Sequence, residues 1–282
     1  MNNLPEPGKQ PQNSGQSSVS QALHLPYGDD AMQFGNLYLP PGPGPHPVAI
    51  VIHGGFWRAP YSYTLMTGLA EDLAQHGIAA WNIEYRRVGD PQGGWPNTLL
   101  DVAMAADHLK RIASHYPLDL QRVITIGHSA GGHLALWLAA RPRIPQDSIV
   151  TGSQTQHTPL AITGVISQAG VVDLEMAWRM NLGNGAAAEL LGGSCSAVPE
   201  RYSAASPAAL LPLGVPQVLI HGTADDRVPF AMSQAYAAKA QAAGDTIQFI
   251  TLPGADHFVL IDATSTAWAK TVQAIQELLR VS

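Results

Sequence analysis

RVITIGHSAGGHLALWLAA, residues 122–140, joins an apolar strand-like run to a helix-like run through a Gly-x-Ser-x-Gly motif at residues 127–131. A serine between a buried strand and a helix lies on a sharp turn, and small flanking residues let the two elements approach and expose its hydroxyl. Such short patterns also arise by chance in a chain with 27 glycines, so the flanking strand and helix carry the interpretation. The sequence predicts that Ser129 is a nucleophile on an elbow.

Apolar runs alternate with helix-like segments over most of the chain. Strands are expected at residues 32–39, 48–52, 78–85, 123–126, 162–168, 216–220 and 246–252, and helices at 62–76, 98–115, 132–140, 229–243 and 264–279. Strands separated by helices of this length predict a mostly parallel sheet with helices on both faces. The expected fold class is α/β, with a single domain over residues 23–282.

Two segments depart from this alternation. Residues 1–22 are rich in Pro, Ser, Gln and Asn, which predicts a flexible N-terminal tail. Residues 171–212 hold a Gly/Ala-rich piece and no clear alternation, and they are expected to form a small lid or cap. An ordinary surface excursion and a substrate-gating role both fit this second segment.

Composition excludes several classes of function. The chain has 282 residues, of which 46% are hydrophobic and 13% charged, and its net charge of −6 comes without any Lys/Arg cluster, so no nucleic-acid partner is expected. The single cysteine, Cys195, cannot form an internal disulfide, and no Cys/His cluster has zinc-ligand spacing; we expect neither a metal nor a cofactor.

With no signal-peptide pattern and no run of membrane-spanning length, a cytoplasmic protein without membrane association is expected. The sequence does not decide the oligomeric state, and a homodimer is among the states that it leaves open.

A serine nucleophile needs a general base, and the base needs an acid to orient it. Where a serine lies on an elbow of this kind in a parallel α/β sheet, these groups follow in the chain order nucleophile, acid, histidine. Four histidines follow Ser129: His133 lies on the helix that leaves the elbow, His157 in a polar stretch, His221 ahead of any acid on its loop, and His257 just past the last expected strand. His257 is therefore the expected base.

The acid is expected in the loop His221-Gly-Thr-Ala-Asp-Asp-Arg-Val-Pro229, which joins a buried strand to a helix. The pattern His-Gly-x-x-Asp-x-x-Val-Pro favours Asp225 over Asp226. Asp173, which also follows a strand, is a third candidate, and a polar cap or lid contact is its more ordinary interpretation. Asp256 is adjacent to His257 and is directed elsewhere by that geometry.

Backbone amides for an oxyanion are expected from Gly54, Gly55 and Phe56, which follow the apolar run at residues 48–52, and from Ala130 after the nucleophile. A plain tight turn would also use two glycines. Aromatic residues near these loops either line a substrate pocket or pack in the interior, and both interpretations stay open. The candidate substrate contacts are Phe56, Trp57, Trp95 and His128.

His53-Gly-Gly-Phe-Trp57, Gly127-His-Ser-Ala-Gly-Gly-His133 and Asp256-His257-Phe258 together resemble the α/β-hydrolase superfamily, and within it the branch of kynurenine formamidases and BD-FAE-like esterases. The resemblance extends from about residue 30 to the end of the chain. It implies hydrolysis of small esters or activated amides by a Ser-His-Asp triad without a cofactor.

Two alternatives to this function remain open. A serine peptidase-like aminoacyl hydrolase would need acidic residues placed to hold a substrate amine. A hydrolase-fold protein that binds a ligand without turnover is the other, although an intact triad argues against it. Fold alone does not decide among these functions.

Overall fold

The computed structural model describes residues 21–151 and 158–281. The tail expected at residues 1–22 lies outside these ranges except for its last two residues, and His157 also lies outside them. No helix in the described ranges is both long and apolar enough to cross a membrane.

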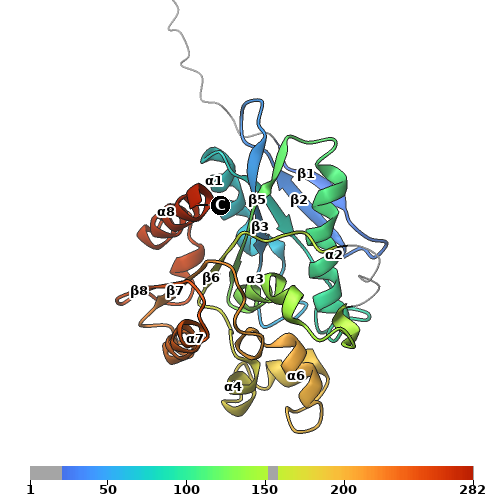
Figure 1. Ribbon diagram of the computed structural model, residues 1–282, viewed down its shortest axis with the longest axis vertical. Coiled ribbons are helices and arrows are strands. Elements are labelled where there is room, and N and C mark those ends of the chain that lie inside the picture. The colour runs from blue at the N-terminus through green and yellow to red at the C-terminus, as the bar shows by residue number, and fades with distance from the viewer. Residues whose placement is uncertain (1–20, 152–157, 282) are drawn as a thin grey trace, which may run out of the picture.

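The core of the fold is an eight-stranded sheet in the order β1-β2-β4-β3-β5-β6-β7-β8 (Figure 1). β1 and β2 run antiparallel to their neighbours, and the other six strands are parallel. This confirms the mostly parallel α/β fold. The strands are β1 Leu23–Pro26, β2 Phe34–Tyr38, β3 His46–Ile52, β4 Ala79–Ile83, β5 Leu118–His128, β6 Gly164–Gln168, β7 Gln217–Gly222 and β8 Ile247–Leu252.

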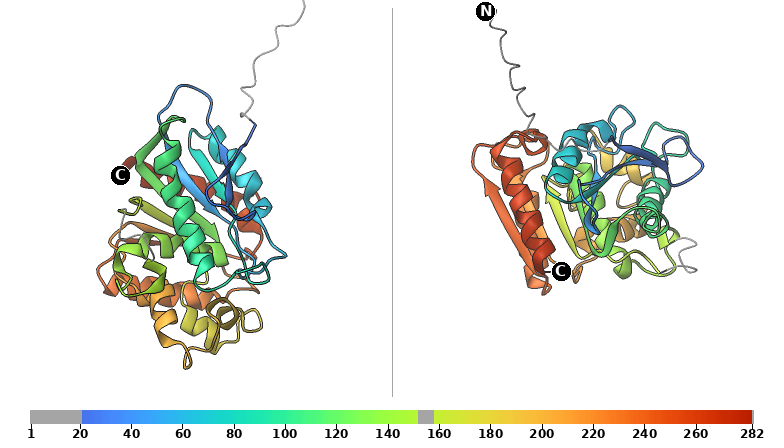
Figure 2. Two further views of the ribbon diagram at one scale, coloured as in Figure 1. Left: turned by 90° about the vertical axis from the view of Figure 1, so that its right-hand side faces the viewer. Right: turned by 90° about the horizontal axis from the view of Figure 1, so that it is seen from above.

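Helices cover both faces of the sheet (Figure 2). On one face α1 (Thr67–Gln75), preceded by the 3-10 turn η1 (Tyr63–Met66), and α8 (Thr266–Val281) share an apolar cluster with the strands. On the other face α2 (Asn97–Ile112), α3 (Ala130–Ala140) and α7 (Phe230–Ala242) share the larger cluster. The central strands are apolar on both sides because both sides are covered.

The strand β1 was not expected from the sequence. Its residues alternate between half-buried and exposed, and it pairs only with β2 at the edge of the sheet. A four-residue edge strand with Pro26 at its end carries too weak an apolar pattern to be recognised.

Residues 171–212 form the short helices α4 (Leu174–Arg179), α5 (Ala186–Leu191) and α6 (Pro199–Ala205), followed by the turn η4 (Pro207–Ala209). Figure 1 shows this cap next to α3, and Trp137 of α3 donates its indole N–H to the Ala204 carbonyl at 3.0 Å. Every residue of α3 is buried because the sheet covers one side of the helix and the cap contacts another. The cap thus packs on the main core, while its gating role stays a prediction.

The turn from β5 into α3 requires close approach of two backbones. A Cβ at Gly127 would lie 2.1 Å from the Gly131 carbonyl oxygen, and a Cβ at Gly131 would lie 2.1 Å from the Ile52 carbonyl oxygen. Because real Cβ atoms do not approach backbone that closely, only glycine fits either position. These two glycines let β3, β5 and α3 converge behind Ser129.

We predict that Gly127→Ala destabilises the protein by about 3 kcal/mol or more, since the added methyl meets rigid backbone. Gly68→Ala is the matched control: it lies in α1, where a Cβ would meet only Ala263 at 3.9 Å, and it should be neutral or stabilising by up to about 1 kcal/mol. Urea unfolding of the two variants and the parent protein measures both effects. Equal stabilities for the two variants would contradict this description of the turn.

Candidate active site

Loops that follow β3, β5, β7 and β8 meet at the carboxyl ends of the strands, where open α/β sheets place their ligand sites. They enclose a pocket of about 150 Å³ that holds both Ser129 and His257. The residues that line the pocket are Gly55, Phe56, Tyr61, Leu65, His128, Ser129, Arg227, His257, Phe258 and Ile261.

Ser129 is held in a strained backbone conformation at the base of this pocket. Its φ of 57° and ψ of −120° lie where L-residues rarely occur. Its amide donates to the Gln168 carbonyl at 2.8 Å, and its carbonyl accepts from the amides of His133 and Val171, each at 3.2 Å. Its hydroxyl makes no hydrogen bond with any other residue in the described ranges. The backbone is thus tied on both sides while the hydroxyl stays available to a ligand.

Asp225 and His257 are in direct contact. His257 Nδ1 lies 2.7 Å from Asp225 Oδ2, and Asp225 Oδ1 accepts from the amides of Arg227 and Val228 at 2.8 Å each. Burial raises the pKa of this carboxyl, but the hydrogen bonds from His221 and His257 outweigh burial and hold the pKa well below its usual range. Asp225 is therefore ionised at neutral pH and holds His257 by Nδ1, which leaves Nε2 for the pocket.

A second histidine contacts the same carboxylate. His221 Nε2 lies 3.1 Å from both Asp225 Oδ2 and the Val228 carbonyl oxygen, and its Nδ1 lies 2.7 Å from Ser233 Oγ. Both neighbours of Nε2 are hydrogen-bond acceptors, so Nε2 carries a proton. His221 is fully buried and does not line the pocket.

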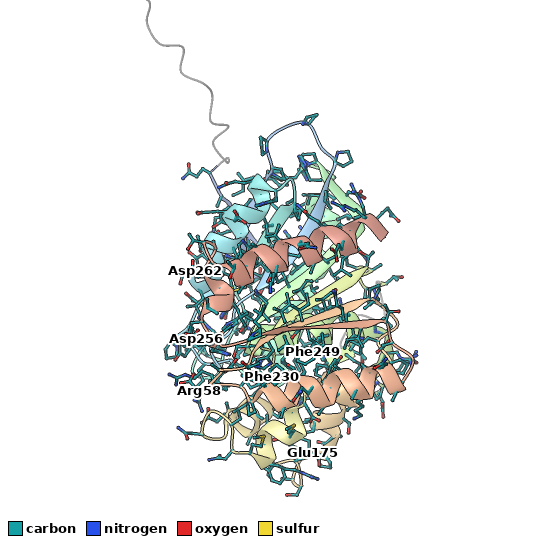
Figure 3. All side chains as sticks on the ribbon, turned by 90° about the vertical axis from the view of Figure 1, so that its left-hand side faces the viewer. Arg58, Glu175, Phe230, Phe249, Asp256 and Asp262 are labelled. Carbon is teal, nitrogen blue, oxygen red and sulfur yellow. The ribbon has the colours of Figure 1, made fainter. Side chains whose placement is uncertain are left out.

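Aromatic side chains fix the ring of His221. Phe230, the first residue of α7, packs edge-on against it with ring centroids 5.6 Å apart, and stacks on Phe249 of β8 at 5.3 Å (Figure 3). From the sequence His221 is only a candidate base, and its supporting contact with Asp225 was not predicted. The signal was present, because His221 opens the same His-Gly-x-x-Asp pattern that singled out Asp225.

The other candidate acids serve local turns. The exposed Asp226 pairs with Arg227, and Asp173 caps α4 by accepting from the Met176 amide at 3.0 Å. Asp256 Oδ1 accepts from two backbone amides of its own loop at 2.9 Å each. Asp225 is the carboxylate that the structure places on His257.

The predicted oxyanion loop lies beside the serine. A Cβ on Gly54 would lie 2.9 Å from Ser129 Cβ, while Gly55 and Phe56 line the pocket. Ala130 is the first residue of α3, and the first amides of a helix have no partner within the helix. The structure thus brings these four residues around Ser129, and their role as oxyanion donors stays a prediction.

Buried polar contacts hold this loop in place. His53 Nε2 lies 2.9 Å from Glu84 Oε1, and His53 Nδ1 lies 2.8 Å from the Gly54 carbonyl oxygen. The ring stacks on Tyr85 with centroids 4.4 Å apart, and the Tyr85 hydroxyl donates to the His53 carbonyl at 2.9 Å. The ring and carbonyl of His53 are therefore both fixed, which restricts the backbone of the loop that follows.

Two of the expected substrate contacts lie elsewhere. Trp57 is 1% exposed and donates its indole N–H to His133 Nδ1 at 3.2 Å. Trp95 packs against the cap. Its backbone amide donates to the Leu190 carbonyl at 2.8 Å, and the Arg201 guanidinium lies 5.9 Å from the centroid of its ring. Neither tryptophan lines this pocket, and its aromatic residues are instead Phe56, Tyr61 and Phe258.

The backbone explains why neighbouring aromatic residues diverge. Phe56 and Trp57 both have positive φ, 52° and 57°, so the chain turns sharply between the pocket and the core. Phe56 lines the pocket and Trp57 is buried.

His128 lines the pocket but also supports its wall. Its Nε2 donates to the His257 carbonyl at 2.9 Å, and the two rings lie 4.4 Å apart. Burial, with the nearby His257, lowers the pKa of His128 to about 3, so this ring is neutral at physiological pH. A fixed neutral ring positions the His257 loop, and its expected contact with substrate stays a prediction.

His133 connects three parts of the structure. It lies on α3, accepts from Trp57 of the loop after β3, and donates from Nε2 to the Ala205 carbonyl of the cap at 2.9 Å. Burial lowers the pKa of His133 to about 4. Between about pH 6.5 and pH 4 the unfolded chain therefore binds a proton that the folded chain does not, and the free energy of unfolding falls as the pH falls.

We predict that His133→Gln weakens this pH dependence. Glutamine can still accept a hydrogen bond from Trp57 and donate one to Ala205, but it does not titrate. The slope of the free energy of unfolding against pH should therefore decrease by up to about 1.4 kcal/mol per pH unit between pH 6 and pH 5. Urea unfolding at several pH values for the parent and the variant gives the two slopes. Parallel stability curves would show that His133 does not carry this proton linkage.

Comparisons with known proteins agree with this geometry. The BD-FAE family profile matches residues 36–240. The chain is 26% identical over 251 residues to the esterase LipC of Mycobacterium tuberculosis, an alignment that covers 85% of this chain and 60% of LipC. It is 38% identical over 138 residues to the kynurenine formamidase avaC of Aspergillus versicolor, covering 44% of this chain and 43% of avaC. The alignments thus span little more than half of the length of LipC and less than half of the length of avaC.

Among solved structures, a truncated form of a carbohydrate esterase from gut microbiota superposes with a TM-score of 0.82 at 22% identity, over 95% of this chain and all of the other. At this identity the likeness concerns the fold, which is an α/β-hydrolase fold. Since the family profile covers most of the chain, including Ser129 and Asp225, the protein belongs to the BD-FAE family.

Proposed function

We propose that the protein is a serine hydrolase that cleaves small carboxylic esters or activated amides through an acyl-enzyme on Ser129. The observation that carries the proposal is the ionised Asp225 bound to His257 at 2.7 Å beside the pocket that His257 shares with Ser129. Membership of the BD-FAE family supports it. The proposal includes a cytoplasmic location, as the sequence analysis expects.

The residues have distinct roles in this proposal. Ser129 Oγ attacks the substrate carbonyl carbon as its proton passes to His257 Nε2, and Asp225 stabilises the resulting imidazolium. The carbonyl oxygen becomes an oxyanion that the amides of Gly55, Phe56 and Ala130 stabilise. His257 then protonates the leaving group as the ester or amide bond breaks.

Water completes the cycle. It attacks the acyl carbon of the acyl-enzyme and gives a proton to His257, and the proton returns to Ser129 as the acid product leaves. No metal or redox cofactor is required at any step.

The pocket favours small substrates. At about 150 Å³ it is smaller than pockets for drug-sized ligands, which run to roughly 300–1,000 Å³. Phe56, Leu65 and Ile261 give it an apolar wall suited to a short acyl group or an aryl ring. The relatives carry the names esterase and kynurenine formamidase, and both bond types fit the same triad chemistry.

Hydrolysis of p-nitrophenyl acetate, p-nitrophenyl butyrate and N-formyl-kynurenine tests the proposal. The parent protein should turn over at least one substrate, and Ser129→Ala should lose about 10³-fold or more in kcat. Activity of Ser129→Ala within about tenfold of the parent would rule Ser129 out as the nucleophile. Preference for the formamide would indicate a formamidase, and turnover of esters alone a small-substrate carboxylesterase.

The neighbouring aspartates give a matched pair of variants. Asp225→Asn should lower kcat by about 10²–10⁴-fold, because an amide cannot stabilise the charged histidine and favours the wrong tautomer. Asp226→Asn alters the adjacent exposed carboxylate and should stay within about threefold of the parent. Initial rates with p-nitrophenyl acetate, on variants checked for folding by circular dichroism, provide the comparison. Equal losses would mean that Asp225 is not the acid of the triad.

A further inference from the structure

Ten residues line the pocket, and one of them, Arg227, has a permanently charged side chain. It comes from the loop between β7 and α7, and its backbone amide donates to Asp225 Oδ1 at 2.8 Å. The base of this side chain is therefore fixed relative to the triad, while the side chain as a whole is 55% exposed and lines the pocket.

Most of the hydrogen-bonding capacity of this guanidinium is unused. Its Nε lies 3.3 Å from Asp226 Oδ1, and that carboxylate is itself 70% exposed. Within the described ranges the two terminal nitrogens make no hydrogen bond. Guanidinium groups bind carboxylates through two parallel N–H donors, and this pair of donors is available to a ligand.

Two aspartates that follow β8 accept hydrogen bonds within their own turns. Asp256 Oδ1 caps the amide of Phe258, and Asp262 Oδ1 accepts from the Thr264 amide at 2.9 Å. Figure 3 shows both aspartates at the margin of the molecule, and neither lines the pocket. Among the residues that line the pocket the permanent charge is thus positive, in a protein whose net charge is −6.

The triad determines which part of the substrate Arg227 faces. The leaving group takes its proton from His257, so it must lie on the side of the pocket that His257 and Phe258 form. Arg227 lines the same pocket, and its backbone amide donates to Asp225, the partner of His257; we therefore assign its side chain to the leaving-group side. Phe258 lines the same pocket, is 53% exposed and offers an aromatic surface there.

We propose that Arg227 selects substrates whose leaving group carries a carboxylate on a small aromatic frame, with the ring against Phe258 and the carboxylate on the guanidinium. The inference rests on the proposed function of Ser129 and specifies its substrate class. In the reaction the bond from Ser129 Oγ to the acyl carbon forms, the ester C–O bond breaks, and the released hydroxy-carboxylate takes its proton from His257.

A matched pair of esters tests this selectivity. We compare 4-acetoxybenzoate, whose leaving group carries a carboxylate, with methyl 4-acetoxybenzoate, in which that charge is masked. Arg227→Gln should lower the ratio of kcat/KM for the charged ester to that for the neutral ester by about three- to tenfold, as expected for a partly exposed charge contact. Arg227→Lys should restore part of the ratio, and added salt should reduce the ratio in the parent protein.

Arg122→Gln is the control with the same change in net charge. Arg122 lies near the start of β5, the end opposite Ser129, and pairs with Asp119. The ratio should stay at the parent value in this variant. An unchanged ratio in Arg227→Gln, with both esters still hydrolysed, would overturn the inference and leave the proposed function intact.

Binding of the products separates the inference from catalysis. In titration calorimetry the parent protein should bind 4-hydroxybenzoate more tightly than its methyl ester, and Arg227→Gln should abolish this difference. If neither ester is hydrolysed, the calorimetry alone decides the role of Arg227, and the proposed function is judged by the p-nitrophenyl esters and N-formyl-kynurenine. Equal affinities of the parent protein for the two ligands would refute the inference.

Discussion

The contact between Asp225 and His257 organises the functional end of this protein. The side chain of Asp225 is fully buried, and a buried carboxylate is costly unless hydrogen bonds satisfy it. Two histidines and two backbone amides do so here. Because these donors come from the end of β7, from the loop after it and from the loop after β8, a single carboxylate fixes both loops and keeps the remaining nitrogen of His257 at the pocket.

The opposite side of the pocket is fixed by backbone geometry. Ser129 occupies its strained conformation because Gly127 and Gly131 allow β5 and α3 to converge and because Gln168 on the neighbouring strand holds its amide. His133 then connects α3 to the loop after β3 and to the cap. The strain of one residue is thus maintained by contacts that extend through the core.

The sequence predicted the parts of this site that depend on local pattern. The elbow glycines, the order of serine, acid and histidine, and the choice of Asp225 over Asp226 follow from backbone requirements and loop motifs that short stretches encode. The side-chain directions of Trp57 and Trp95 do not follow from such short stretches. Two successive positive φ values and contacts with the cap decide these directions. His221 was missed as a support for Asp225 because that role exists only once Phe230 and Phe249 have packed around it.

The most direct test of whether Ser129 is an activated nucleophile is labelling with a fluorophosphonate probe, followed by peptide mapping in a mass spectrometer. The probe reacts with a serine only where a base activates the hydroxyl and an oxyanion site receives the phosphonyl oxygen. We expect one label per chain, on the peptide that contains Ser129, and strongly reduced labelling when His257 is replaced by glutamine. A folded protein that stays unlabelled, or that carries the label on another serine, would contradict it.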